Sequence, residues 1–167
     1  LSRIWRAQHI PTKLKADIFR TSVISVLSYG CESWVLSKKL EQQLNCFVNK
    51  CYRGIIGIKI LDRVSNEDLY KRIGLPPATE LIRKRQLKWL GHALRRENNE
   101  ISKIFALYIP ENDLREDKRG APKLSYREYI TKVIRTCYDV EQPADIERLA
   151  RNHACWRNLV APCSAAE

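Results

Sequence analysis

Apolar residues in this sequence recur every three or four positions, within segments that end at glycine or proline. One such series steps by four, three and four residues, which places its side chains on a single face of a helix. It consists of Leu40, Leu44, Phe47 and Cys51. The segments contain no internal repeat, and their spacing predicts an all-α chain built as a bundle of about five or six helices.

Capping residues and glycine stops set the limits of the expected helices. Ser65 is expected to cap a short helix that ends at Gly74, and Ser125 with Glu128 matches a capping box that opens a later helix. The expected helices cover residues 12–29, 40–53, 65–73, 79–96, 125–137 and 143–160. The expected inner face of the first helix consists of Leu14, Ile18, Val23, Val26 and Leu27.

Residues 97–124 are expected to form an irregular basic connector between two helical parts. Within it, the apolar run from Ile104 to Ile109 is compatible with a strand or with a helical turn. The expected domains are a helical region over residues 1–96, the connector over 97–124, and a C-terminal helical pair over 125–163.

The charge balance favours a polyanionic partner. The 167 residues include 30 Lys and Arg against 19 Asp and Glu, a formal net charge of +11, and clustered cations gain free energy by releasing counterions from phosphate backbones. The stretch from Arg83 to Arg96 holds six Lys and Arg and no acid. On the helix expected there, three leucines form an apolar stripe and the cations lie on the opposite arc. We predict nucleic-acid contacts from Lys84, Arg85, Lys88, His92, Arg95 and Arg96 on this helix, and from Lys118, Arg119 and Lys123 in the connector.

Several other classes of protein are excluded or disfavoured. No apolar run approaches the ~18 uncharged residues that a membrane span needs, and the N-terminus lacks the apolar core of a signal peptide. Six scattered cysteines do not form a dense disulfide framework, so we expect mostly buried free thiols in a reducing compartment.

The sequence contains no Met and opens on Leu1, which predicts a fragment of a longer translation product.

No catalytic or metal-binding motif stands out. Phosphate-binding loops, nucleophile elbows and dinucleotide fingerprints are absent, and the adjacent acids have the pattern of solvated charges. The soft ligands near Cys46 and Cys51, or near His153, Cys155 and Cys163, could hold zinc, but their spacing favours core cysteines and a hydrogen-bonded core histidine. For Trp5, Trp34 and Trp156 we favour core positions over stacking on bases. We therefore predict no catalytic residue and no metal ligand in this chain.

Several sequence strings, taken in order, resemble the region downstream of the polymerase core in non-LTR retrotransposon (LINE) reverse transcriptases, most closely RTE-like elements. The string Trp89-Leu90-Gly91-His92-x-Leu94-Arg95 is similar to the family's Trp-x-Gly-His-x-x-Arg. The other strings are Thr12-Lys13-Leu14, Tyr29-Gly30-Cys31-Glu32-Ser33-Trp34, Asn49-Lys50-Cys51-Tyr52-Arg53, Asp62-Arg63-Val64-Ser65-Asn66, Gly120-x-Pro122 and Trp156-Arg157. The chain departs from the family pattern at Ala121, Tyr126 and Asn152-His153.

The resemblance implies a thumb-like and C-terminal region that holds the template–primer backbone during target-primed reverse transcription. The palm of the family, with its Mg²⁺-binding carboxylates, would lie upstream of Leu1, so the resemblance implies an RNA-directed DNA polymerase fragment that is inactive alone and carries no cofactor. The implied partners are element RNA, RNA–DNA hybrid or target DNA, and the palm of the parent polyprotein, with no membrane. The implied location is intracellular, in the cytoplasm for assembly and in the nucleus for integration.

A second hypothesis belongs to another class. The chain could be a domesticated or orphan helical module that binds acidic protein partners and has no role with nucleic acid. Competition between a structured RNA–DNA hybrid and heparin would separate the two hypotheses.

Overall fold

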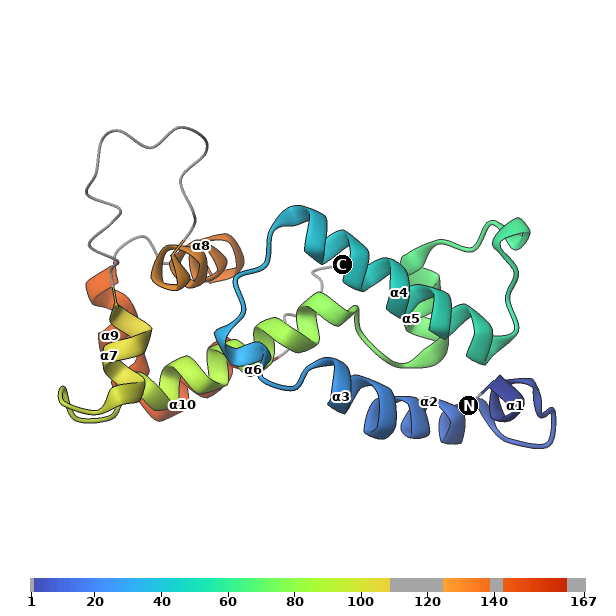
Figure 1. Cartoon of the computed structure of the whole chain (residues 1–167), viewed down its shortest axis with the longest axis horizontal. Coiled ribbons are helices and arrows are strands. Elements are labelled where there is room, and N and C mark those ends of the chain that lie inside the picture. Colours follow the sequence, from blue (N-terminus) through green and yellow to red (C-terminus); the bar gives the residue numbers. More distant parts are fainter. Residues whose placement is uncertain (1, 109–124, 139–142, 162–167) are drawn as a thin grey trace. The chain divides into compact units, whose positions relative to one another are not determined.

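The computed structural model describes residues 2–108, 125–138 and 143–161. Within these residues helices are the only regular secondary structure, which confirms the predicted all-α fold (Figure 1). The chain divides into two compact units. Unit 1 comprises residues 1–30 and 36–82, and unit 2 comprises residues 31–35 together with the chain from residue 83 onward.

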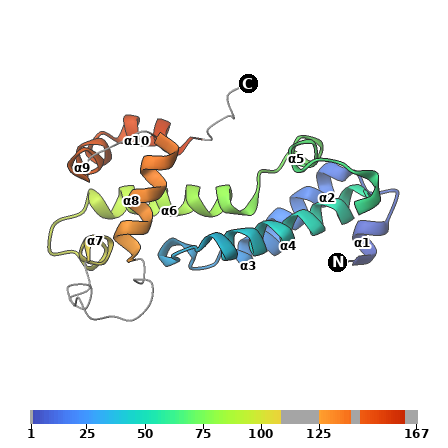
Figure 2. The same cartoon turned by 90° about the horizontal axis from the view of Figure 1, so that it is seen from above.

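Unit 1 is built on a long helix, α4 (Lys38–Ile56). It contacts α1 (Ser2–Arg6), α2 (Thr12–Phe19) and α5 (Asn66–Ile73), and α2 also contacts α5 (Figures 1 and 2). Their shared core includes Phe19, Val48, Tyr52 and Leu69, each no more than 1% exposed. The rings of Phe19 and Tyr52 meet edge to face with centroids 5.4 Å apart.

A π-helical turn, Arg20–Ile24, separates α2 from the short helix α3 (Ser25–Leu27). A π turn inserts an extra residue and rotates everything that follows it, so a single 3.6-residue period cannot describe residues 12–27. The buried residues are Ala16, Phe19 and Ile24, whereas Leu14 is 51% and Val26 75% exposed. The prediction that Leu14 and Val26 face the core was therefore wrong.

The inner face of α4 also differs from the predicted one. Val48, Tyr52 and Ile55 are buried and follow steps of four and three, as the predicted series does. Of the predicted face, Leu44 and Cys51 pack against this core, whereas Leu40 and Phe47 remain almost half exposed.

The predicted caps of α5 are confirmed. The Ser65 hydroxyl accepts a hydrogen bond from the Asp68 backbone N–H at 3.1 Å, and Gly74 ends the helix with φ of 70°. Gly57, with φ of 80°, ends α4 in the same left-handed conformation, which glycine adopts without steric cost. A short 3₁₀ turn, Ile60–Asp62, follows α4.

Unit 2 is organised around α6 (Ala78–Leu94), whose first residues belong to unit 1. Leu87, Leu90 and Leu94 are buried, as the sequence predicts. The other helices are α7 (Ile101–Leu107), α8 (Tyr126–Tyr138), α9 (Pro143–Arg151) and α10 (His153–Val160). Figure 2 shows α8 running across α6, and the predicted capping box of Ser125 and Glu128 is present at its start.

A buried polar network joins α6 and α8 to the 3₁₀ turn Cys31–Ser33. Gln86 is fully buried, and its amide nitrogen donates to the backbone carbonyls of Cys31 and Trp34 at 3.0 and 2.8 Å. The Tyr129 hydroxyl donates to the Gln86 side-chain oxygen at 3.1 Å. These bonds explain why residues 31–35 belong to unit 2, although the neighbouring chain belongs to unit 1.

An aromatic cluster lies where α7 meets α8. The ring of Trp89 lies edge to face with those of Phe105 and Tyr126, at centroid distances of 5.9 and 5.8 Å. Burial raises the pKa of the Tyr126 hydroxyl well above its usual value, so this ring stays neutral in the cluster.

Three local predictions are corrected in unit 2 and at the thiols. Part of the expected irregular connector forms helix α7, which settles the strand-or-helix alternative for its described residues in favour of a helix. The expected last helix divides into α9 and α10 at Asn152, and His153 is exposed rather than in the core. Among the described cysteines, Cys46 and Cys155 are exposed and Cys31 is buried, so the thiols are less buried than expected.

No helix in the described part of the chain is long and apolar enough to cross a membrane. The two compact units group residues by proximity and do not test the expected domain limits at residues 96 and 124, which stay predictions.

Candidate nucleic-acid interface

The candidate site begins with close packing between α6 and α10. The Trp156 indole is buried, and its N–H donates to the backbone carbonyl of Leu87 on α6 at 3.0 Å. A Cβ atom on Gly91 would lie 2.0 Å from that indole nitrogen, so glycine at this position lets the ring rest on the α6 backbone. The predicted core position of Trp156 is confirmed.

This packing leaves a groove of about 570 Å³ lined by α6 and α10. Its floor includes Trp156 and Val160, which are buried. The basic residues that line it are Lys84, Lys88, His92 and Arg95 from α6, and His153 and Arg157 from α10. No acidic side chain is among the described residues of the lining.

The α6 cations lie along one side of the helix. Lys84, Lys88 and His92 are four residues apart, so they follow one another at about 6 Å along the helix axis. Lys88 and His92 are exposed, while Lys84 is half-buried, an arrangement in which a long side chain covers apolar surface and keeps its charge in water.

Each histidine of the groove has an arginine partner one turn further along its own helix. The Arg96 guanidinium donates to His92 Nε2 at 3.1–3.3 Å, and the Arg157 guanidinium lies 3.5 Å from His153 Nδ1. A ring nitrogen that accepts from a guanidinium carries no proton, which leaves the other ring nitrogen as a donor.

Arg95 has a structural partner within unit 2. Its Nη1 donates to the backbone carbonyl of Ala150, in the last turn of α9, at 3.0 Å. A cation at a helix C-terminus is stabilising because it meets the negative end of the helix dipole. Arg95 therefore both lines the groove and fixes α9.

The predicted site residues divide into three groups. Lys84, Lys88, His92 and Arg95 come together in the groove. Arg96 is not in the groove lining, but its guanidinium is hydrogen-bonded to His92, which is. Arg85 is not in the lining either, and its side chain interacts with the Cys31 thiol. The predicted contacts at Lys118, Arg119 and Lys123 lie outside the described residues.

The basic residues that α10 contributes to the groove, His153 and Arg157, were not among the site residues predicted from the sequence. A single helix with one period over residues 143–160 predicts a core position for His153. Asn152 interrupts that period, and its side-chain oxygen accepts from the backbone N–H groups of Ala154 and Cys155. An asparagine that can serve as an N-cap inside an apparently continuous helix is the signal that would have separated α9 from α10.

The chemistry of the groove is that of an anion-binding surface. Lysine and arginine side chains donate hydrogen bonds and stay charged at neutral pH, and the lining residues that the structure describes include no carboxylate for acid–base or metal chemistry. In the described part of the chain, no group of three or more His, Cys, Asp or Glu residues could hold a metal ion.

The described part of the chain is thus an all-α protein. Its groove between α6 and α10 is basic and has no acidic residue in its described lining. No family of known proteins and no solved structure matches the chain significantly. The chain is similar to an uncharacterized transposon-derived protein of Caenorhabditis elegans, with 24% identity over 104 residues. The match covers 60% of this chain and 37% of that protein, so the chain spans little more than a third of its relative.

Proposed function

We propose that this chain binds the phosphodiester backbone of nucleic acid through the groove between α6 and α10. The groove places the charges of Lys84, Lys88 and Arg157 beside one another with no carboxylate in its described lining. Such a surface attracts phosphates and releases their counterions. This concentration of charge is the observation that carries the proposal.

The proposed parent protein is a LINE reverse transcriptase, most similar to RTE-like elements. In it, the chain would form the thumb-like region that holds a template–primer duplex during target-primed reverse transcription. The ordered sequence strings support this assignment, and so does the similarity to a transposon-derived protein. Two of those strings, around Gly91 and Trp156, also contact each other in unit 2. Mg²⁺ and the chemical step would belong to the palm of that parent protein.

Binding should depend steeply on salt. If the groove neutralises about four phosphates, affinity for a duplex should fall about a hundredfold between 50 and 200 mM salt. Fluorescence anisotropy with a labelled RNA–DNA hybrid over this range measures the slope. A slope near zero would contradict backbone binding.

A triple charge reversal assigns the binding to the groove. Lys84→Glu, Lys88→Glu and Arg157→Glu together should remove about three units from the slope of log affinity against log salt. Arg95 is left intact because its bond to Ala150 holds α9 in place.

A second triple variant provides the matched control. Lys39→Glu, Lys50→Glu and Lys71→Glu change the net charge equally at exposed positions of unit 1 and should leave most of the affinity intact. Equal losses in both variants would show that net charge, and not the groove, determines binding. If heparin and single-stranded RNA compete as well as the hybrid does, the thumb-like role would be rejected while backbone binding would stand.

A further inference from the structure

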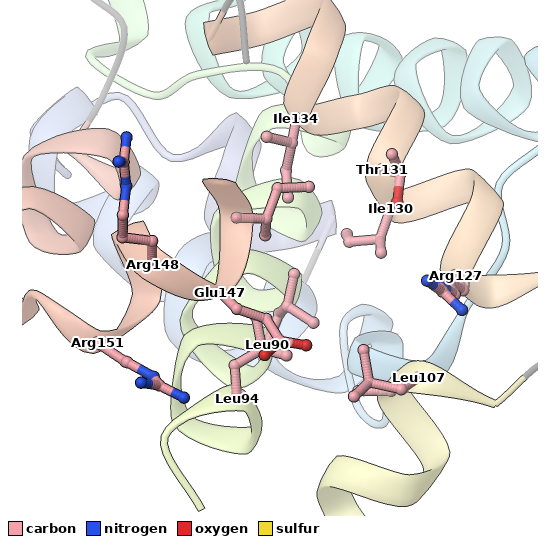
Figure 3. Close-up of a pocket in the computed structure, with 12 residues that line it drawn as sticks. Leu90, Leu94, Leu107, Arg127, Ile130, Thr131, Ile134, Glu147, Arg148 and Arg151 are labelled. Carbon is pink, nitrogen blue, oxygen red and sulfur yellow. The ribbon is translucent and has the colours of Figure 1, made fainter. Parts of the chain in front are cut away.

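A second cavity in unit 2 differs in chemistry from the basic groove. It has a volume of about 490 Å³ and is lined by α6, α7, α8 and α9 (Figure 3). Its size lies within the range of protein binding pockets, which are typically ~300–1,000 Å³. The proposed nucleic-acid function uses none of its lining residues.

The cavity has an aliphatic floor and a charged rim. Leu90 and Leu94 of α6 and Ile130 and Ile134 of α8 are each at most 5% exposed and form the floor with their neighbours. Arg148 and Arg151 of α9 are exposed and therefore belong to the rim. A floor of this kind accepts a large apolar side chain, and the rim remains accessible to polar groups of the same ligand.

Two arginines of the cavity have no ionic partner within the described residues. No described carboxylate lies within 4.0 Å of the guanidinium of Arg127 or Arg151. Both residues line the cavity from different helices, α8 and α9, and they lie on opposite sides of it in Figure 3. The opening therefore presents two cations to an incoming ligand.

Glu147 restricts the kind of ligand further. Glu147 also lines the cavity from α9, and in the view of Figure 3 it lies between the two arginines. A carboxylate accepts hydrogen bonds and repels an anion placed directly on it. A simple fatty acid, with one anionic head and no donor, fits this arrangement poorly. A peptide fits it better, because it offers apolar side chains, backbone N–H donors and separate acidic side chains.

We propose that this cavity is a docking site for a short acidic amphipathic helix of a partner protein. The apolar face of that helix would place one large side chain on the aliphatic floor, the mode in which helices bind apolar grooves. Its acidic side chains would meet Arg127 and Arg151, and N–H groups of its first turn would face Glu147. The surface is separate from the basic groove and recognises a different class of partner.

The test uses the full chain and a designed probe. The probe is a fluorescein-labelled peptide with leucines three and four residues apart and with glutamate and alanine between them. Fluorescence anisotropy should show saturable binding. A matched peptide with lysine in place of every glutamate, and another with alanine in place of every leucine, should not bind. Absence of saturable binding by the acidic peptide, or equal binding of the lysine peptide, would overturn the proposal.

Variants of the chain assign the binding to the cavity. Arg127→Gln with Arg151→Gln should weaken peptide binding about tenfold, because two ion pairs are lost. The control pair Lys132→Gln with Lys71→Gln removes the same charge at exposed positions outside the cavity and should have no effect. Equal weakening by both pairs would overturn the assignment.

A third variant fills the cavity without changing its charge. Thr131 lines the cavity from α8 and is half-buried, so Thr131→Phe should block the aliphatic floor and abolish peptide binding. Circular dichroism checks that the variant is folded, and the variant with Arg127→Gln and Arg151→Gln keeps the proposal testable if it is not. All cavity variants should bind RNA–DNA hybrid as the unmodified chain does, which separates this proposal from the nucleic-acid function.

Discussion

Gly91 and Trp156, which belong to two separate sequence strings, pack against each other and join α6 to α10. Gly91 leaves room for the indole, and the indole N–H bonds to the carbonyl of Leu87. The residues that neighbour them in sequence, His92 and Arg157, then line the same groove. Packing at a glycine thus determines where the groove cations lie.

Replacement of Gly91 by alanine should destabilise unit 2. The added Cβ would lie 2.0 Å from the Trp156 indole nitrogen, so the ring must move and its hydrogen bond to Leu87 must lengthen. Overpacking of this kind costs about 1–3 kcal/mol. Urea denaturation followed by tryptophan fluorescence measures the change.

Gly54 provides the matched control for this substitution. It lies inside α4, and a Cβ there would meet nothing within 4 Å. Gly54→Ala should therefore stabilise the chain by up to about 1 kcal/mol, because alanine is the better helix former. If both alanine variants change stability in the same direction, the close approach of Trp156 does not explain Gly91.

Arg95 shows that a basic residue in the proposed interface can also hold the fold together. Its guanidinium bonds to the Ala150 carbonyl at the end of α9, a contact that periodicity on α6 cannot reveal. On the sequence alone, Arg95, Lys84 and Lys88 are equivalent cations. Of these three α6 residues, only the two lysines test binding without also disturbing α9.

At the scale of the element, Asn152 determines the direction of α10. Its side chain caps the first turn of that helix through the backbone N–H groups of Ala154 and Cys155. Because α10 starts anew after Asn152, His153 turns to the groove and Trp156 to α6. One capping residue therefore sets both faces of this helix.

Loss of this cap should weaken the groove as well as the helix. Asn152→Ala should cost about 1 kcal/mol of stability, the usual contribution of an N-cap side chain. It should also reduce the affinity for RNA–DNA hybrid, since α10 carries His153 and Arg157. Denaturation curves and hybrid binding at constant salt measure the two effects.

Asn158 is the appropriate comparison, since it is exposed within the same helix and has no capping role. Asn158→Ala should leave both stability and affinity almost unchanged. A result in which the two variants behave alike would mean that the cap does not orient α10.

The elements differ in how well the sequence predicts them. The stripe of Leu87, Leu90 and Leu94 was predicted because α6 carries only one apolar series opposite its charges. The face of α4 was predicted only in part, because Leu44 and Cys51 pack against the core while Leu40 and Phe47 stay almost half exposed. Only tertiary contacts select among the neighbouring apolar positions of that helix. The π turn at Arg20–Ile24 has no signal in apolar spacing, so the inner face of residues 12–27 was predicted only in part. Val23 and Leu27 pack against the core, whereas Leu14 and Val26 are exposed.

At the scale of the whole molecule, the net charge of +11 indicates a polyanionic partner without locating it. One half of the groove was predictable, because the α6 cations lie in a single acid-free segment. The other half comes from α10, about 60 residues later in the sequence, and depends on helix packing that no local pattern encodes. The second cavity, which brings together four helices, was not predicted at all for the same reason.

Lysine footprinting of the full chain tests directly whether the groove between α6 and α10 is the nucleic-acid interface. The chain is acetylated with and without a saturating RNA–DNA hybrid, and the modification of each lysine is measured by mass spectrometry. We expect strong protection of Lys84 and Lys88 by the hybrid, and unchanged labelling of the exposed lysines Lys39 and Lys71. Unchanged labelling of Lys84 and Lys88 under saturating hybrid would contradict the groove as the nucleic-acid interface.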